Sequence, residues 1–167
     1  MTCSLHAVSV SVFARMLRHV STLLDKATAD AEARNYEPAV LLQSRLSPDM
    51  FPLLRQVQLA CDFAKGASAR LAGVPVPAFA DEEQTIGELK ARIDKVLVFV
   101  EGVSRADVDA GADRDITIKL RDRSVDMKGI DYLNNMAMPN FYFHVTTVYA
   151  ILRHNGVAIG KRDFVGV

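Results

Sequence analysis

The stretch that decides the fold is the N-terminal run from Ser4 to Arg34, SLHAVSVSVFARMLRHVSTLLDKATADAEAR. Its apolar residues recur at steps of three and four, which places them on one face of a helix. That face contains Leu5, Val8, Val12, Met16, Val20, Leu23 and Ala27, and it is widened by Phe13, Leu17 and Leu24. The run therefore predicts one long amphipathic helix with a broad buried side. Asn35 should end it, and a short helix is expected at Ala39–Gln43.

A second helical stretch begins with a clear start signal. Ser47 is suited to cap a helix and Pro48 to occupy its first position. Gly73 ends the helical period, and the following Val74-Pro75-Val76-Pro77 cannot continue a helix. The sequence therefore predicts a second long helix between Ser47 and Gly73.

Two more helices and a hairpin complete the predicted elements. Thr85-Ile86-Gly87-Glu88 has the spacing of a capping box, which predicts a third helix that ends near Gly102. After this helix, apolar and polar residues alternate along the chain, which is the pattern of a β-hairpin with one apolar face. We expect strands near Arg114–Leu120 and Ser124–Met127, with an apolar face on the helices made of Ile116, Ile118, Val125 and Met127. The last helix is expected over Ile130–Asn155, with a kink from Pro139.

These elements predict a mainly all-α protein. The expected architecture is an up-down four-helix bundle with one small β-hairpin inserted before the last long helix. The chain has 167 residues, which is close to the usual length of a single domain, and no long linker divides it. Hydrophobic residues make up 50% of the chain and charged residues 24%, which excludes a disordered protein. We therefore expect residues 1–167 to form one domain.

The composition also restricts the partners and the location. Twenty basic residues balance twenty acidic ones, so the net charge of +0 does not attract a nucleic-acid backbone. No apolar run approaches the roughly 18 residues that span a bilayer, and the N-terminus has no signal-peptide pattern. Cys3 and Cys61 lack a metal-binding spacing and are expected as reduced thiols. The sequence thus predicts a cytoplasmic protein that binds neither nucleic acid nor membranes.

The broad apolar stripes of the first and last helices predict more apolar surface than one bundle covers. A homodimer through helix faces is therefore the expected assembly. Motifs for a phosphate loop, a G-x-S-x-G nucleophile and an H-E-x-x-H metal site are all missing from the sequence.

His144 is the main candidate for a functional side chain. It lies within the apolar stripe of the last helix, and a buried imidazole needs a hydrogen-bond partner. Asn140, four residues earlier, shares its helix face. Asp49 and Gln56 lie along one edge of the second helix, from which either could supply a polar group to a site in the bundle. A purely structural His144 and an ordinary solvated face on the second helix remain open as alternatives.

Two stretches resemble a known family. The first is Leu46–Pro52, LSPDMFP, followed by RQVQ at 55–58; the second is Pro139–Val157, PNFYFHVTTVYAILRHNGV, followed by GKRDF at 160–164. Together they resemble a family of uncharacterised bacterial domains of unknown function, grouped with the DinB/YfiT-like superfamily of metalloenzymes. The resemblance implies a four-helix bundle, often dimeric. It also implies a divalent metal held by one His from the second helix and an H-x-x-x-H pair from the last long helix.

This chain departs from the family's metal-binding pattern. The resemblance places the pair at Asn140 and His144, so only His144 matches, and the second helix offers Asp49 or Gln56 instead of a His. An amide oxygen is a poor ligand for zinc or nickel. We therefore expect no cofactor, and a binding or structural module with a degenerate metal site that holds a small molecule, water or nothing near His144. The alternative is a metal-dependent or His-based hydrolase or transferase that uses His144, with zinc or nickel as the metal.

Overall fold

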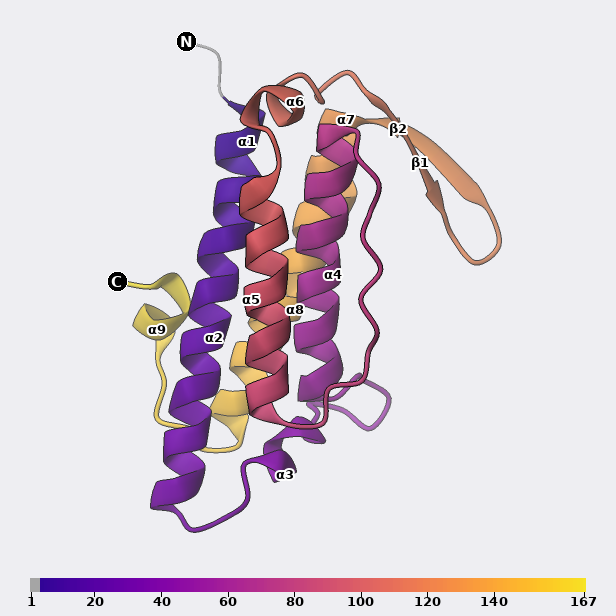
Figure 1. The fold of residues 1–167 in the computed structure, drawn as a ribbon. Coiled ribbons are helices and arrows are strands. Elements are labelled where there is room, and N and C mark those ends of the chain that lie inside the picture. Colours follow the sequence, from indigo (N-terminus) through magenta and orange to yellow (C-terminus); the bar gives the residue numbers. More distant parts are fainter. Residues whose placement is uncertain (1–3) are drawn as a thin grey trace.

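Four long helices pack side by side in the computed structural model, which describes residues 4–167 (Figure 1). They are α2 (Val10–Ala33), α4 (Leu53–Ala72), α5 (Ile86–Gly102) and α8 (Met138–His154). The predicted bundle with a hairpin before the last long helix is confirmed. The 74–84 segment crosses the length of the bundle, so α4 and α5 run in the same direction while α2 and α8 run in the opposite one (Figure 1). The helices therefore do not alternate strictly up and down as expected, because this crossover replaces a short connection.

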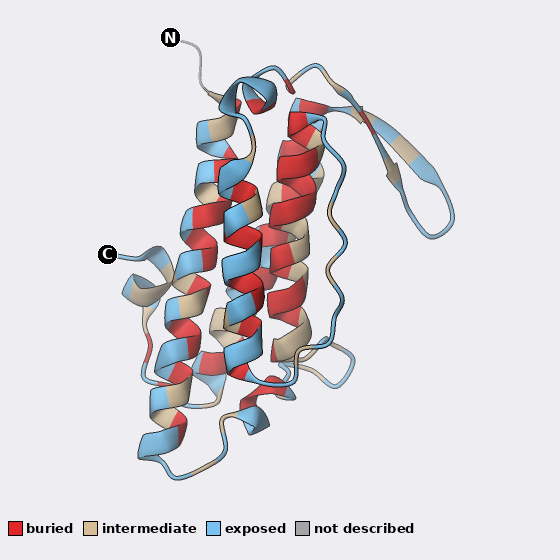
Figure 2. Ribbon diagram, viewed as in Figure 1, coloured by how far each residue is buried: buried red, intermediate tan, exposed pale blue. Residues whose placement is uncertain are grey.

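Each long helix turns its apolar stripe inward, as the buried faces in Figure 2 show. Phe13 of α2 and Phe141 of α8 are both fully buried, and their rings meet edge to face with centroids 4.9 Å apart. Burial of such large side chains is the main stabilising contribution to the fold. Within residues 4–167, no helix is both long and apolar enough to span a lipid bilayer.

The first helix is not continuous, contrary to the prediction. α1 (Leu5–Val8) and α2 are separated by Ser9, whose backbone leaves the helical region at φ −123° and ψ −83°. The Ser9 hydroxyl donates to the carbonyl of Leu5 at 2.6 Å. Such side-chain bonds compete with the helical pattern. After α2, α3 (Ala39–Leu42) forms near the predicted position.

The second helix begins later than predicted. Ser47 and Pro48 lie in the loop before α4, and the helix starts at Leu53 after an extended Pro52 with ψ 167°. A proline disfavours helical backbone in the residue before it, so a helix that began at Pro48 would break at Phe51. Gly73 ends α4 in the left-handed conformation, φ 73°, as its sequence position indicates.

The predicted capping box at the start of α5 is present. The Thr85 hydroxyl accepts from the backbone N–H of Glu88 at 3.1 Å, and the Glu88 carboxylate accepts from the backbone N–H of Thr85 at 2.9 Å. A short helix, α6 (Arg105–Asp109), then leads toward the hairpin.

The hairpin has the predicted paired strands but little support from the helices. β1 (Asp115–Lys119) pairs antiparallel with β2 (Ser124–Lys128). Of the predicted apolar face, Ile116 is buried, whereas the other three residues are only half-buried: Ile118, Val125 and Met127. The reason is that the hairpin stands out from the bundle beyond its base (Figure 1).

The last helix is divided by a π-helical turn where a kink was predicted. α7 (Gly129–Tyr132) continues into the π-helix η1 (Leu133–Ala137) and then into α8. The backbone N–H of Met138 bonds to the carbonyl of Leu133, one residue further back than in an α-helix. Pro139 has no N–H to give to the preceding turn, and the wider turn accommodates it. The C-terminal α9 (Lys161–Val165) packs back against α2.

Candidate functional site

The candidate site is a pair of buried polar side chains from α8 and α4. His144 is only 7% exposed, and its Nδ1 lies 2.7 Å from Oε1 of Gln56, which is also buried. Nε2 of Gln56 donates to the carbonyl of Phe51 at 3.0 Å. The pair therefore connects α8, the first turn of α4 and the loop that precedes it.

These bonds fix the tautomer of His144. Because the amide nitrogen of Gln56 donates to Phe51, its oxygen faces the ring and can only accept. Nδ1 of His144 must then carry the proton, which leaves a lone pair on Nε2 when the ring is neutral. Nε2 makes no hydrogen bond to any residue of the described chain. It is nevertheless accessible to solvent, because the one fully enclosed side-chain nitrogen or oxygen without a partner in residues 4–167 is Nε of Arg92.

The surroundings favour the neutral ring. The ring stacks on Phe63 with centroids 5.5 Å apart and meets the edge of Phe143 at 5.3 Å. Burial lowers the pKa of His144 below its ordinary value, and the positive charge of Arg55 lowers it further. His144 is therefore neutral at pH 7, with Nε2 available as a hydrogen-bond acceptor.

The structure does not bring the other two predicted residues to this pair. Asp49 was expected on the edge of the second helix, but it is exposed in the loop before α4, where its carboxylate accepts from the Ser47 hydroxyl at 2.6 Å. The Ser47 hydroxyl also lowers the pKa of Asp49. Asn140 is half-buried on α8, and its amide donates to the carbonyl of Met136 at 2.7 Å. Asp49 and Asn140 therefore make their hydrogen bonds with nearby residues of their own loop or helix, and not with His144.

The residues near His144 do not fit the metal site that the resemblance implies. That site needs three imidazoles, whereas this pair consists of one imidazole and one amide that bond to each other. Across residues 4–167, no group of three or more His, Cys, Asp or Glu side chains is placed to hold a metal ion.

An exposed apolar surface adjoins the pair, and we call it the α8 face. It consists of residues of the loop before α4 and of α8, namely Leu46, Met50, Phe51, Tyr142 and Phe143. Phe51 is 58% and Phe143 54% exposed. Residues from both elements line a hollow of about 430 Å³. The face is tied to the pair through the Phe51 carbonyl and through Phe143, which touches the His144 ring.

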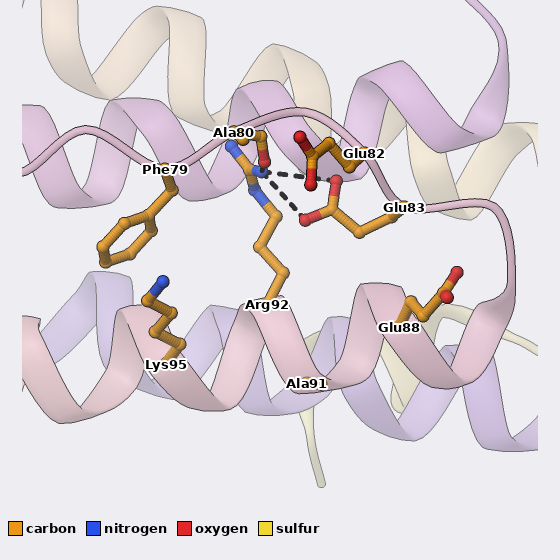
Figure 3. A pocket seen from close by; sticks show the side chains of 8 residues that line it. All are labelled: Phe79, Ala80, Glu82, Glu83, Glu88, Ala91, Arg92 and Lys95. Carbon is orange, nitrogen blue, oxygen red and sulfur yellow. Dashed lines mark hydrogen bonds and ion pairs between the residues drawn. The ribbon is translucent and has the colours of Figure 1, made fainter.

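A second polar cluster, which the sequence analysis did not single out, lies on the opposite side of α4. The Arg92 side chain rises from α5 to the 74–84 segment and is 2% exposed (Figure 3). Its guanidinium pairs with Asp62 of α4 at 3.1 Å, with Asp81 at 2.8 Å and with Glu83 at 3.0 Å. It also donates to the carbonyl of Ala80 at 2.9 Å. One side chain therefore fastens α4, α5 and the connecting segment together.

Glu83, one of the acids around Arg92, is held in the charged form. Burial raises the pKa of Glu83, but hydrogen bonds from Gln58 and Arg92 outweigh it and leave the pKa below its usual range. Nearby, the ring of Phe79 lies between the ammonium groups of Lys65 and Lys95, at 4.5 and 4.1 Å. A pocket of about 350 Å³ lies over this cluster (Figure 3).

A signal for the Arg92 cluster is present in the sequence. Arg92 follows Leu89 by three residues and precedes Val96 by four, so it falls on the apolar stripe of α5. A charged residue on a buried stripe needs partners. The neighbouring thiol of Cys61 is enclosed, and burial raises its pKa to about 12, so it is not a nucleophile. Cys3 lies outside the described residues.

Comparisons with known proteins identify the family. The family described as a domain of unknown function (DUF1993) matches residues 5–165. The chain belongs to this family. Among solved structures, the crystal structure of a DinB family member protein from Shewanella denitrificans is 44% identical, with a TM-score of 0.90 over 98% of this chain and 92% of that one. No curated protein matches. The resemblance to an uncharacterised DinB-like family is thus confirmed.

Replacement of His144 by Phe tests the burial of the imidazole. Phe keeps the ring contacts but leaves Oε1 of Gln56 without a donor, so the free energy of unfolding at pH 7.5 should fall by about 1–3 kcal/mol. The folded-state pKa of His144 is lowered, so the unfolded chain binds the proton more tightly. His144 therefore stabilises the fold above an unfolded pKa of ~6.5, and this contribution is lost as the pH falls.

Urea unfolding at several pH values measures this effect. The gap between the wild type and His144→Phe should narrow on acidification from about pH 7.5 toward pH 5. The exposed His154, replaced by Gln, is the control and should leave the pH profile unchanged. A gap that is the same at every pH would contradict a desolvated His144.

Replacement of Arg92 by Met tests the second cluster. The carboxylates of Asp62, Asp81 and Glu83 would lose their shared partner, and the unfolding free energy should fall by about 2–4 kcal/mol, since the acids keep some access to water. Limited proteolysis should then cut within 74–84. The control is Lys90→Met on the same helix, which removes an exposed ion pair and should cost less than about 1 kcal/mol. Equal losses in the two variants would show that Arg92 does not fasten this segment.

Proposed function

We propose that this protein is a binding or structural module whose ancestral metal site has degenerated, and that it forms a homodimer through the α8 face. The observation that carries the proposal is the exposure of aromatic side chains on that face. Tyr142 and Phe143 of α8 line one hollow together with Leu46 of the loop before α4. The same loop carries the exposed Phe51. Contiguous exposed apolar patches in soluble proteins commonly mark interaction sites.

The charge pattern of α8 supports an interface. From Pro139 to Leu152 the helix has no Asp, Glu, Lys or Arg, although part of this stretch is exposed. Depletion of charge and enrichment of aromatic residues distinguish the centres of protein interfaces from other surfaces. A twofold arrangement would place this face of one copy against the same face of another, as in most homodimers.

The stripe of the first helix does not supply the second interface that the sequence suggested. Most of its residues lie buried in the bundle, including Phe13, Leu17 and Leu24. Only Val8 and Val12 keep partial exposure. The proposed dimer therefore rests on α8 and the loop before α4 alone. This loop belongs to the face because the Gln56 amide holds the Phe51 carbonyl.

The degenerate metal site is supported by the bond between His144 and Gln56. Where the resemblance implies two further His ligands, this chain has the amides of Gln56 and Asn140, which are poor ligands for zinc or nickel and are already bonded to His144 and Met136. Nε2 of His144 is then a single ligand, too few for a stable site. The small-molecule ligand that the sequence suggested would then donate a hydrogen bond to Nε2 of His144. A cytoplasmic location fits the free thiol of Cys61.

A His-based hydrolase or transferase is the second candidate, and one observation favours it. Nε2 of His144 has a lone pair, its ring is oriented by Gln56, and its pKa is lowered. These are properties of a general base, which takes a proton from water or from a substrate hydroxyl. Within residues 4–167, no nucleophilic or oxyanion-binding side chain is hydrogen-bonded to this nitrogen, so the binding module is the better-supported function.

Sedimentation velocity tests the proposed dimer. The wild type should sediment at tens of micromolar as a species of twice 18.4 kDa. Phe143→Lys should shift it to the monomer, because a charge buried at the interface centre costs several kcal/mol, on the order of 2–5. The matched control is Val98→Lys, which changes a 76% exposed residue of α5 away from the face and should leave the dimer intact. A monomeric wild type would overturn the proposal.

Metal analysis of untagged protein separates the two candidate functions. The binding module predicts far less than one zinc or nickel per chain, and no change in His144→Ala. Stoichiometric metal that is lost in His144→Ala would reject the degenerate site and support a metal-dependent enzyme. Gln56→His provides a gain-of-function arm, since a second imidazole opposite His144 should raise zinc affinity.

A further inference from the structure

A separate pocket of about 220 Å³ lies between the hairpin and the outer side of α4. Its walls are mainly apolar and come from α4, β1 and η1: Leu59, Phe63, Ile118 and Met136. Three polar side chains also line it, namely Asp62, Arg70 and Tyr132. This pocket is distinct from the α8 face and from the Arg92 pocket.

The guanidinium of Arg70 has no acidic partner. Across residues 4–167, no carboxylate lies within ion-pair distance of it, although Arg92 alone has three. The polar contact of Arg70 is a hydrogen bond to the Tyr132 hydroxyl at 3.3 Å. Asp62 on the same pocket wall is already paired with Arg92 and Lys65, each at 3.1 Å. Arg70 thus leaves several donors free inside a largely apolar pocket.

The hydroxyl of Tyr132 also has an unused donor. Tyr132 is 2% exposed, and its oxygen accepts from Arg70 but gives its own hydrogen to no group within the described chain. Burial raises the pKa of Tyr132 despite the opposing charge of Arg70, so the hydroxyl keeps its proton. A buried donor without an acceptor costs free energy unless a ligand or water completes it.

The backbone of α4 leaves space for the guanidinium. A Cβ at Gly66, one turn before Arg70, would lie 2.5 Å from a terminal nitrogen of Arg70. Glycine is unfavourable within a helix, yet here it lets the Arg70 side chain fold back along α4 toward the pocket. Met136, which also lines the pocket, belongs to the π-helical turn η1, and such turns are frequent at functional sites.

We propose that this pocket binds a small carboxylate with a hydrophobic body. The carboxylate lies against the guanidinium of Arg70 and the hydroxyl of Tyr132, and the body packs among Phe63, Ile118 and Met136. A guanidinium and a hydroxyl together supply the in-plane donors that a carboxylate accepts. An apolar cavity of about 150 Å³ can hold one benzene ring, so this pocket accommodates a single ring or a short alkyl chain.

A singly charged ligand fits better than phosphate. Asp62 places a negative charge on the pocket wall, which disfavours a dianion. Inorganic phosphate also has no apolar part that could pack against the apolar side chains of the pocket. The hairpin contributes to the proposed site through Ile118, which forms part of the wall that the hydrophobic body of the ligand contacts.

Calorimetric titration of the full chain tests the proposal with benzoate and hexanoate as probes. Each should bind once per chain and saturably at millimolar concentration, at constant ionic strength. Neutral benzamide and inorganic phosphate should bind at least about tenfold more weakly. Wild-type protein that binds neither acid, benzamide that binds as tightly as benzoate, or phosphate that binds more tightly would overturn it.

Three variants test the assigned contacts. Arg70→Met keeps the aliphatic stem and should weaken benzoate binding at least about tenfold, and Tyr132→Phe by about three- to tenfold. Gly66→Ala should displace the guanidinium and weaken binding, while the midpoint of thermal unfolding stays the same or rises because Ala favours helix. The control Arg153→Met removes an exposed arginine of α8 and should bind like the wild type. Unchanged affinity in Arg70→Met and Gly66→Ala would reject Arg70 as the anion-binding residue.

Discussion

The hydrogen bond between His144 and Gln56 is the interaction on which the candidate site depends. It joins the centre of α8 to the first turn of α4 at 2.7 Å, and the other end of the same amide holds the Phe51 carbonyl. Both side chains are buried, so each would pay a desolvation cost without the other. The bond uses Nδ1 of the imidazole, fixes the tautomer and positions the aromatic α8 face.

Helix α4 is held on two sides by different chemistry. Toward α8 it uses the neutral His144–Gln56 bond, and toward α5 it uses the ion pairs of Arg92, which also fix the 74–84 segment. That segment has to cross the whole bundle because α4 and α5 run in the same direction (Figure 1). The segment has little regular structure, so it has no helical face to pack against the bundle. The ion pairs of Asp81 and Glu83 with Arg92 attach it to α5 instead. Such buried charges contribute specificity of the arrangement more than net stability.

The parts of the fold that could be predicted are those with local causes. Helical stripes, the capping box at Thr85, the stop at Gly73 and the period-two hairpin are all determined within a few residues of sequence. Predictions failed where a nearby residue overrode the pattern, as Ser9 did for the continuity of the first helix and Pro52 for the start of α4. Gln56 could be identified only as one of two candidates, with Asp49, for a polar group of the second helix near His144, because helical periodicity does not say which of them faces α8. The Arg92 partners could not, because Asp81 and Glu83 lie on a non-helical segment whose path periodicity does not describe.

The protonation of His144 is the most direct test of this account, and nitrogen-15 NMR of the imidazole rings measures it. At pH 7 the account predicts a neutral His144 with its proton on Nδ1, an exchange-protected Nδ1–H, and a free Nε2. On titration, the His144 ring should charge at a pH below the ordinary pKa of histidine, because burial lowers its pKa. Loss of the Nδ1 signal position in Gln56→Leu would confirm the partner. A proton on Nε2, a charged ring at pH 7, or a shift on addition of a metal chelator would contradict the account.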